Sequence, residues 1–326
     1  VAIAARFAHT LALRVDGSVL GWGRNNDGES NPPPGGPNTG FVAIAAGNAH
    51  SLGLKANGSI VAWGLNYSGQ CNVPPPNSSF VAIAAGGAHS LGLKDDGSIV
   101  VWGSGSYGQC DVPSTNAQFV AIEAGMEHSL GVKANGSVVA WGDNLSGQCN
   151  VPAPNTGFVA VAGGDFFSLG LKANGSIVGW GDNDDYQCNV PAPNTGFVAL
   201  AAGAYHSLGL RSGGSIIAWG WWVHGQCDVP APNTAFVAVA GGGYHSLGLK
   251  AFYGDLNCDG AINFDDITPF VRALTDPGAY AAQFPRCHRL NADCNADGSV
   301  DFNDIDPFVA LLRSHPVPNT QNRVQP

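Results

Sequence analysis

Short apolar runs alternate with glycine-containing turns along the first 250 residues, and the same order of runs returns every 39 residues. Each copy carries three such runs, of the type V-A-I-A-A, H-S-L-G-L-K and S-I-V-A-W-G. An Asn-Gly or Asp-Gly turn joins the second run to the third in most copies, and such a turn is a strong hairpin signal because its backbone needs positive φ. The pattern therefore predicts an antiparallel meander of about three strands in each copy.

The histidine of each H-S-L segment marks the copies, at His9, His50, His89, His128, His206 and His245, with Phe167 in the fifth copy. A fixed period of this length indicates stacked supersecondary units. The strands are apolar on both faces, which is typical of blades that pack on a blade at either side. Residues 1–235 supply six copies, and residues 236–250 supply the first two strands of a seventh. We expect an all-β, seven-bladed propeller whose last blade is incomplete, because the sequence begins just after the place of a closing N-terminal strand.

The repeated string A-x-G-x-x-H-S-L-x-L-K-x-[N/D]-G-x-[I/V]-x-x-W-G-x-N-x-x-G-Q resembles the regulator of chromosome condensation family over residues 1–250. The run into G-Q-x-x-V-P is most similar to the secreted β-lactamase inhibitory proteins of the propeller type. The resemblance implies the propeller fold. It implies neither a ligand nor nucleotide exchange, because function on such a scaffold lies in the loops.

The composition changes at Ala251, and two similar twelve-residue segments follow, at residues 255–266 and 293–304. Both have oxygen-bearing side chains at positions 1, 3, 5, 9 and 12 and glycine at position 6, as in a calcium-binding loop. Each segment leads into a stretch with apolar residues at helical spacing. The sequence predicts two Ca²⁺ sites. Their ligands would be Asp255, Asn257, Asp259, the backbone carbonyl of Ala261, Asn263 and Asp266, then Asp293, Asn295, Asp297, the backbone carbonyl of Ser299, Asp301 and Asp304.

Two loop–helix units without a preceding helix pattern resemble a dockerin type I domain, from about residue 254 to 313. The resemblance implies attachment to a cohesin-like protein. Phe264-Asp265 and Phe302-Asn303 replace the usual small hydroxyl residues, so a standard cohesin partner is in doubt. Cys258 and Cys287 resemble the disulfide pair of planctomycete-type dockerins. We expect a propeller at 1–250, a dockerin-like domain at 251–315 and a disordered tail at 316–326.

The net charge is −10, with 24 acidic and 14 basic residues and no basic stripe. Nucleic acid and an anionic membrane surface are therefore poor partners. No apolar run is long enough to span a membrane, so we expect no membrane insertion. A disulfide in the second domain would suit a secreted or cell-surface protein.

The repeated histidines could form a ring of metal ligands, but Phe167 interrupts the series. We expect them to pack and to hydrogen-bond within their own blade. The tryptophans of the W-G segments are expected in the core, at positions 22, 63, 102, 141, 180 and 219. The repeated cysteines are expected to be small buried thiols, at positions 71, 110, 149, 188 and 227.

The loops after the first and third strands of each copy vary, and both kinds open on the same side of the predicted propeller. A constant scaffold with a variable aromatic rim is typical of a binding protein, although loop drift gives the same pattern. The candidate rim residues are Tyr107, Phe166, Tyr205, Trp221, Trp222, His224 and Tyr244.

The favoured function is a secreted, non-enzymatic recognition module that binds a protein or a glycan. Two alternatives stay open. One is an enzyme acting on polysaccharide with rim carboxylates among Glu127, Asp165, Asp184 and Asp185, and the other is a β-lactamase inhibitor.

Overall fold

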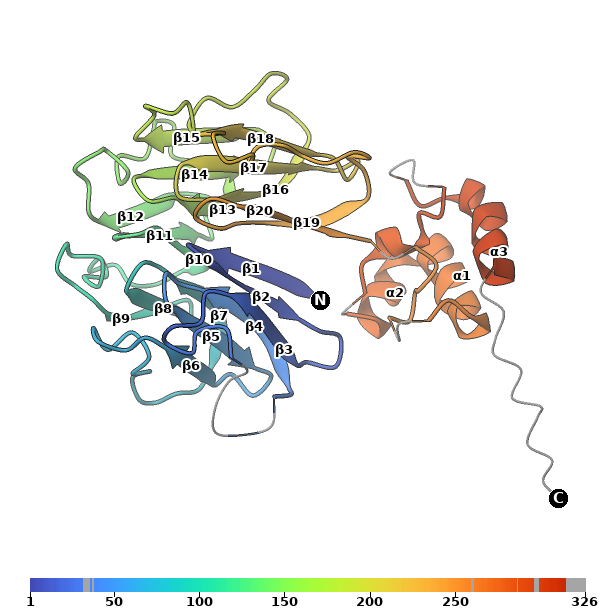
Figure 1. Ribbon diagram of the computed structural model, residues 1–326, viewed down its shortest axis with the longest axis horizontal. Coiled ribbons are helices and arrows are strands. Elements are labelled where there is room, and N and C mark those ends of the chain that lie inside the picture. The colour runs from blue at the N-terminus through green and yellow to red at the C-terminus, as the bar shows by residue number, and fades with distance from the viewer. Residues whose placement is uncertain are drawn as a thin grey trace. The chain divides into compact units, whose positions relative to one another are not determined.

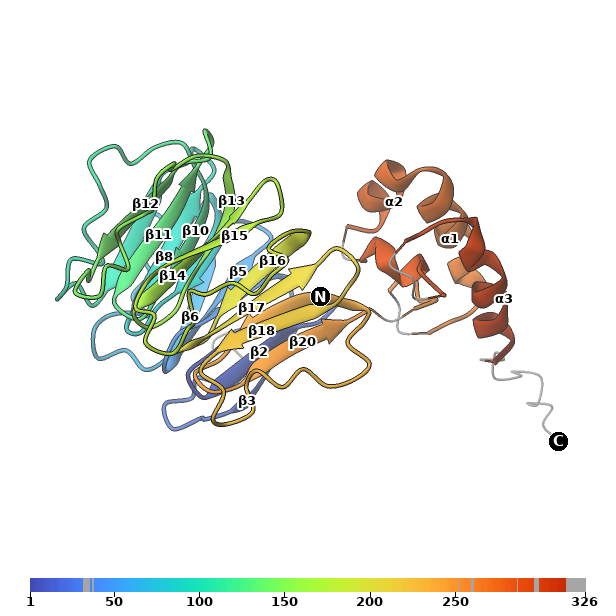
Figure 2. The same ribbon diagram turned by 90° about the horizontal axis from the view of Figure 1, so that it is seen from above.

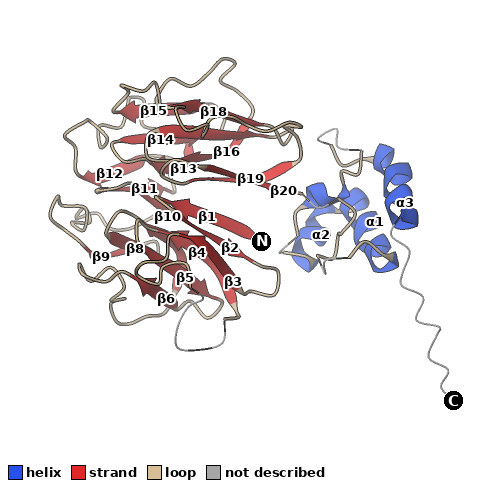
Figure 3. Ribbon diagram, in the orientation of Figure 1, coloured by secondary structure: helices blue, strands red, loops and turns tan. Residues whose placement is uncertain are grey.

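The computed structural model of the protein describes residues 1–31, 36, 38–251, 253–258, 261–285, 287–295 and 299–314. Its contacts divide the chain into two compact units, Val1–Leu249 and Lys250–Pro326. Within the described residues, the strands lie in the first unit and the helices in the second (Figure 3). The two units are described separately below.

Seven antiparallel sheets follow one another along the first unit (Figure 1). The first strands of the sheets are β1 (Ala2–Arg6), β4 (Phe41–Ala46), β7 (Phe80–Ala85), β10 (Phe119–Ala124), β13 (Phe158–Gly163), β16 (Phe197–Ala202) and β19 (Phe236–Gly241). The second strands are β2 (His9–Leu13), β5 (His50–Lys55), β8 (His89–Lys94), β11 (His128–Lys133), β14 (Phe167–Lys172), β17 (His206–Arg211) and β20 (Ser246–Lys250). The third strands are β3 (Val19–Gly23), β6 (Ile60–Gly64), β9 (Ile99–Gly103), β12 (Val138–Gly142), β15 (Ile177–Gly181) and β18 (Ile216–Gly220).

The sheets close into a ring, and we number them blades 1 to 7 in chain order. The first strand of each blade contacts the first strand of the next, and β19 contacts β1. Figures 1 and 2 show blade 1 (blue) beside blade 7 (orange). In the described part of the chain, β20 pairs with β19 alone, so blade 7 has two strands. The expectation of an all-β propeller built from repeated three-stranded blades is confirmed, and in the described residues the ring has seven sheets, the last with two strands.

Each seam between blades is filled by apolar side chains from both. Between blades 4 and 5, Leu130 and Val138 pack with Phe158 and Trp180, and the two rings lie 6.3 Å apart. Gly170 makes room for Phe158, because a Cβ atom at this glycine would lie 2.5 Å from the phenyl ring. The seams therefore repeat one packing arrangement around the ring.

The tryptophans of the W-G segments are buried in blades 2 to 6, as expected from the sequence. The expectation is wrong for Trp22 of blade 1, which is 48% exposed. In blade 2 the Trp63 indole donates to the carbonyl of Glu29 in the preceding blade, and in the described residues blade 7 has no third strand to cover Trp22 in the same way.

The tight turns differ in detail from the expected geometry. In the turn of blade 4, Gly136 has a φ of 77°, whereas Asn135 is not among the residues with positive φ. The Asn135 side chain instead accepts hydrogen bonds from the backbone N–H and the hydroxyl of Ser137. Glycine thus supplies the left-handed conformation, and asparagine stabilises the turn with its side chain.

The second unit contains α1 (Ile267–Thr275), α2 (Pro277–Gln283) and α3 (Ile305–Ser314), with short 3₁₀ turns at Phe264–Asp266, Arg289–Ala292 and Phe302–Asp304. Phe270 and Phe308 stack at 4.1 Å in its core. Cys258 and Cys287 form a disulfide, as the resemblance implied.

Helix α2 was not expected. Its signal is Asp276, which caps the helix by accepting from the N–H of Ala279 and precedes a proline. None of the described helices has the length and apolar character needed to cross a membrane.

Candidate functional sites: an aromatic rim, a charged channel and two acidic loops

The loops after the first and third strands open on one face of the propeller, which we call the loop face. Strands one and three of a blade both pair antiparallel with strand two, so they run in the same direction. Backbone hydrogen bonds join the two loops of a blade, as from the N–H of Trp221 to the carbonyl of Tyr205 at 2.9 Å. The tight turns between strands two and three lie on the opposite face, the turn face.

Five of the predicted rim residues form one continuous group of rings on the loop face of blades 5 to 7. The group, called the aromatic cluster below, consists of Phe166, Tyr205, Trp221, His224 and Tyr244. Ring centroids lie 6.5 Å apart for Phe166–Tyr205, 5.8 Å for Tyr205–Trp221, 5.0 Å for Trp221–His224 and 5.3 Å for Trp221–Tyr244. Three blades therefore combine side chains that are far apart in the sequence into one surface.

The other two rim residues lie outside these ring contacts. Trp222 is 71% exposed beside the cluster, and Tyr107 is exposed in blade 3. The structure adds Tyr186, which the sequence argument missed and which is 69% exposed. Its φ is 63°, and the equivalent position is glycine in the other five loops of this kind, at Gly28, Gly69, Gly108, Gly147 and Gly225. This departure from the repeat could have been noticed in the sequence.

The repeated histidines link neighbouring blades, so the expectation of a bond within the blade is wrong. His50 Nε2 lies 2.9 Å from Ser90 Oγ, and His128 Nε2 lies 2.9 Å from Ser168 Oγ. His9, His89 and His206 make the same contact with the serine of the next blade. His245 of blade 7 contacts the hydroxyl of Thr10 in blade 1, which completes the ring. Burial lowers the pKa of His50, His89 and His128 to about 3. These imidazoles are neutral structural links at neutral pH.

The repeated cysteines are half-buried rather than fully buried, and each is a free thiol. The thiol of each donates to the carbonyl oxygen six residues earlier, as from Cys149 to Asp143 at 3.2 Å. Burial raises the pKa of Cys149 and Cys188 to about 12. Such thiols are poor nucleophiles and hold the loop after the third strand.

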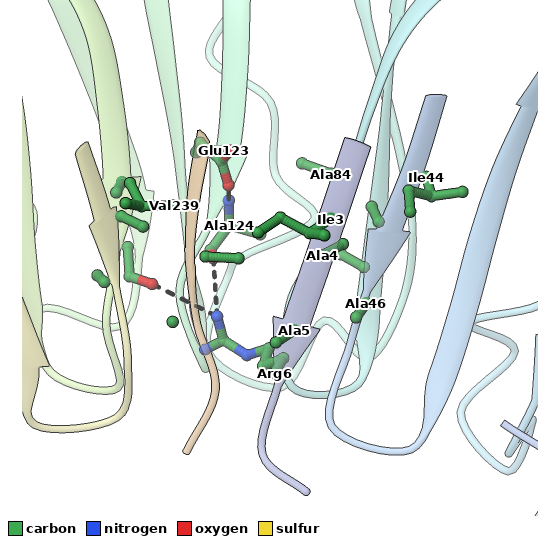
Figure 4. Close-up of a pocket in the computed structure, with 18 of the residues that line it drawn as sticks. Ile3, Ala4, Ala5, Arg6, Ile44, Ala46, Ala84, Glu123, Ala124 and Val239 are labelled. Carbon is green, nitrogen blue, oxygen red and sulfur yellow. Dashed lines mark hydrogen bonds between the residues drawn. The ribbon is translucent and has the colours of Figure 1, made fainter. Parts of the chain in front are cut away.

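A cavity of about 200 Å³ lies at the centre of the ring and is lined by residues from the first strand of every blade. Arg6 crosses its loop-face end (Figure 4). From blade 1, its Nη1 donates to the carbonyls of Ala124 in blade 4 and Gly163 in blade 5, at 3.1 and 3.4 Å. Its Nη2 lies 3.6 Å from Asp165 Oδ1. The equivalent residue in the other copies is glycine, so Arg6 is a specific departure from the repeat.

Glu123 is the other charged side chain in the lining, where the remaining copies carry alanine. Its carboxylate accepts from the N–H of Ala124 at 3.3 Å, and Figure 4 shows Glu123 deeper in the cavity than Arg6. Although Glu123 is exposed to the solvent of the cavity, the surrounding protein raises its pKa to about 7, and the Ala124 N–H and Arg6 oppose this shift. Sequence reasoning missed both Arg6 and Glu123.

The rim carboxylates considered for catalysis have different local partners. Asp165 pairs with Arg6, and Glu127 accepts a hydrogen bond from the side chain of Gln109. Asp184 and Asp185 lie in the loop after the third strand of blade 5. The four residues thus belong to different local networks rather than to one described group.

The two acidic loops of the second unit are closed by their twelfth residues. Asp266 is fully buried, and its carboxylate accepts from the N–H groups of Leu256, Asn257 and Asn263 at 2.7, 3.1 and 2.9 Å. Asp304 accepts in the same way from Asn295 and Asp301, at 3.0 and 2.9 Å. Each carboxylate therefore joins the beginning of its loop to the end.

The expected ligand set fits a hard cation in chemistry, with Asp255 and Asp293 also buried. Neither Asp266 nor Asp304 takes part in the salt bridges of the described residues. Burying a carboxylate is costly unless it is hydrogen-bonded, paired or bound to a cation, so a hard cation is compatible with this set. Position five of each loop, Asp259 and Asp297, lies outside the described residues. In the part that is described, no three His, Cys, Asp or Glu side chains are placed to hold a metal ion.

Six segments of the chain match the family model described as the regulator of chromosome condensation (RCC1) repeat. They are residues 1–29, 41–70, 80–109, 119–148, 158–187 and 197–226, which together make up more than half of the sequence. No curated protein matches the chain.

Several solved structures are similar to the propeller. The ectodomain of the receptor kinase CR4 from Physcomitrella patens has 24% identity and a TM-score of 0.64, over 76% of this chain and 70% of that one. Prp20p from Saccharomyces cerevisiae, described with its binding to Gsp1p and histones, has 20% identity and a TM-score of 0.65, over 76% and 82%. Human WBSCR16 has 20% identity and a TM-score of 0.61, over 76% and 86%. At these identities the likeness shows the fold.

Proposed function

Because the chain belongs to the regulator of chromosome condensation (RCC1) repeat family, we propose that its propeller is a protein-binding module that contacts its partner through the aromatic cluster. The observation that carries the proposal is the assembly of five rings from three blades on the variable face. At the position of Phe166, Tyr205 and Tyr244, the blades without the cluster have Ala8, Ala49, Ala88 and Glu127. The fold is therefore complete without these rings, and a role in recognition accounts for them.

The second unit would attach the propeller to a larger extracellular assembly in a calcium-dependent way. Asp266 and Asp304 hold their loops closed, and the oxygen-bearing residues of each loop would bind one Ca²⁺. A bound ion would offset the repulsion between the buried carboxylates. The Cys258–Cys287 disulfide supports an oxidising, secreted or cell-surface location. The attachment partner would be a protein of the cohesin-like kind.

The propeller half of the proposal is tested by placing a photo-crosslinking residue at position 222 or at position 135 of the full chain. Asn135 lies in a tight turn on the turn face and provides the matched control. Partner proteins should be captured from position 222 and not from position 135. Equal capture from both positions, or capture from position 135 alone, contradicts the proposal.

With the captured partner in hand, Trp222→Ala should weaken its binding by about 2 kcal/mol and leave the melting temperature nearly unchanged. Asn135→Ala should do the reverse, because it removes the side-chain bonds to Ser137 at a site away from the partner. Hydrolysis of a polysaccharide panel or inhibition of β-lactamase by the purified chain would instead favour the two alternative functions.

A further inference from the structure

The surface around the aromatic cluster carries negative charge. Asp165 precedes Phe166, and the loop after the third strand of blade 5 contributes Asp182, Asp184 and Asp185. Burial raises the pKa of the Tyr205 phenol, and the nearby negative charges of Asp165, Asp182 and Asp185 add to this shift. The carboxylates therefore lie close enough to the cluster to act on its rings.

Basic side chains are directed away from this surface. Seven of the nine basic residues of the propeller lie at the turn-face end of a second strand, either as its last residue or directly after it. They are Arg14, Lys55, Lys94, Lys133, Lys172, Arg211 and Lys250. The other two lie on the loop face and pair with carboxylates there. Arg6 pairs with Asp165 at 3.6 Å, and Arg24 pairs with Asp27 and Glu29 at 3.0 and 3.5 Å. Among the described residues, Asp182, Asp184 and Asp185 take part in no salt bridge.

We propose that the aromatic cluster, together with Trp222 and Tyr186, binds a lysine- or arginine-bearing segment of the partner protein. A cationic head group is attracted to the face of an aromatic ring and also to the carboxylates beside it. Acidic segments would be repelled by the same charges. The proposal deepens the function given above and rests on it, because it names the chemistry of the partner at the same surface.

Tyr186 gives the proposal a variant that separates binding from folding. Its left-handed backbone favours glycine, which the other five loops have at this position. The residue is largely exposed, and Asp184 and Asp185 directly precede it in the sequence. Tyr186→Gly should therefore relieve backbone strain while it removes an aromatic ring from the binding surface.

The experiment measures fluorescence anisotropy of a short labelled peptide in which arginine and lysine alternate with glycine, titrated with the full-length protein. The control peptide carries citrulline and acetyl-lysine in place of the two cations. The cationic peptide should bind and the neutral one should not. Affinity should fall when ionic strength rises from about 0.05 to 0.5 M, because salt screens exposed charges.

The protein variants then locate the peptide. Trp222→Ala should weaken binding about tenfold, and Tyr186→Gly several-fold with an equal or higher melting temperature. The double variant Asp184→Asn/Asp185→Asn should remove most of the salt dependence. Tyr67→Ala is the matched control, because Tyr67 is 93% exposed in the corresponding loop of blade 2, which carries no acidic residue.

Three results would overturn the proposal: equal binding of the neutral peptide, equal loss with Tyr67→Ala, or no binding of the cationic peptide. If crosslinking at position 222 still captures a partner that the cationic peptide fails to displace, the charge argument fails and the proposed function stands. If position 222 captures nothing and the peptide does not bind, both fail.

Discussion

The Nε2 atom of His128 lies 2.9 Å from the Oγ atom of Ser168 in the next blade, and this contact fixes the position of the imidazole proton. Ser168 donates its hydroxyl hydrogen to the carbonyl of Gln148 at 2.9 Å, so it must accept from Nε2–H. The same carbonyl accepts from the indole N–H of Trp180 at 2.9 Å. The buried Nδ1 of His128 has no hydrogen-bond partner among the described residues, as the neutral tautomer allows.

The histidine links should make folding stability depend on pH. His128 has a pKa of about 3 when folded and about 6.5 when unfolded, because burial disfavours the imidazolium. As pH falls below about 6.5 the unfolded chain binds the proton first, so stability is lost, and the loss continues until the folded-state pKa is reached. One such histidine should cost about 2 kcal/mol between pH 6.5 and 5.

His128→Phe tests this link, because Phe167 occupies the equivalent place in blade 5. Thermal melts between pH 7 and pH 4.5 should show a shallower loss of stability in the variant than in the parent chain. Ser168 keeps its bond to Gln148, so the variant should fold normally at neutral pH. Superimposable pH profiles would show that His128 does not titrate as described.

Glu123 should have the opposite pH dependence. Its pKa is raised from 4.5 to about 7 in the folded chain, so the folded state holds a proton that the unfolded state has released. Stability from this group is present below about pH 4.5 and is lost as pH rises through about 7. Glu123→Ala, which restores the residue of the other six blades, should raise the melting temperature at pH 8 and leave it nearly unchanged at pH 4.5. An equal shift at both values would assign the effect to packing rather than to charge.

Calcium should bind at two sites in the second unit. Calorimetric titration of the full-length, calcium-stripped chain should show two Ca²⁺ ions per molecule. At about 100 times the dissociation constant, the unit should gain about 2.7 kcal/mol of stability per site. Asp266→Asn and Asp304→Asn should each remove one site, because each carboxylate closes its own loop.

Asp265→Asn is the control for the calcium experiment, since Asp265 is exposed in the same loop and stands at a position that is not an expected ligand. It should retain both sites. No calcium uptake by the parent chain, or the same loss with Asp265→Asn, would contradict the assignment.

The incomplete seventh blade leaves a defined place for one more strand. Where a blade has three strands, the backbone carbonyl of the glutamine or glutamate in the loop after its third strand accepts two hydrogen bonds from the next blade. At Gln148 the donors are the Ser168 hydroxyl and the Trp180 indole. At Gln226, among the described residues, Ser246 alone donates. A cavity of about 320 Å³ lined by Leu208, Ile216 and Phe236 lies beside it. An indole on an added strand would fill this cavity and contact the same carbonyl.

Extension of the chain before Val1 by a segment of the S-I-V-A-W-G type, joined by the usual repeat loop, should raise the melting temperature by several degrees. It should also reduce aggregation, because an exposed strand edge promotes association. The same extension with alanine for tryptophan should give a smaller gain. If neither extension changes melting or light scattering, the seam is closed in another way.

The sequence by itself determined the architecture of this protein. The 39-residue period placed the strands and their turns, because hairpin pairing depends on residues close in the chain and on apolar runs of fixed length. The spacing of oxygen-bearing residues in the two loops of the second unit was equally local, as was the rim of variable residues. The exception is α2, which the pattern of apolar residues does not predict although a capping aspartate and a proline mark its start.

The tertiary structure alone decided which distant side chains meet. Closure of the ring brings His245 to Thr10, 235 residues apart, and lets Arg6 reach Gly163, 157 residues away. It also directs each histidine to the next blade and combines Tyr205, Trp221 and Tyr244 into one surface. The repeat fixes pairing inside a blade, whereas contacts across seams and across the channel depend on the number of blades and the angle between them. A local pattern contains neither quantity.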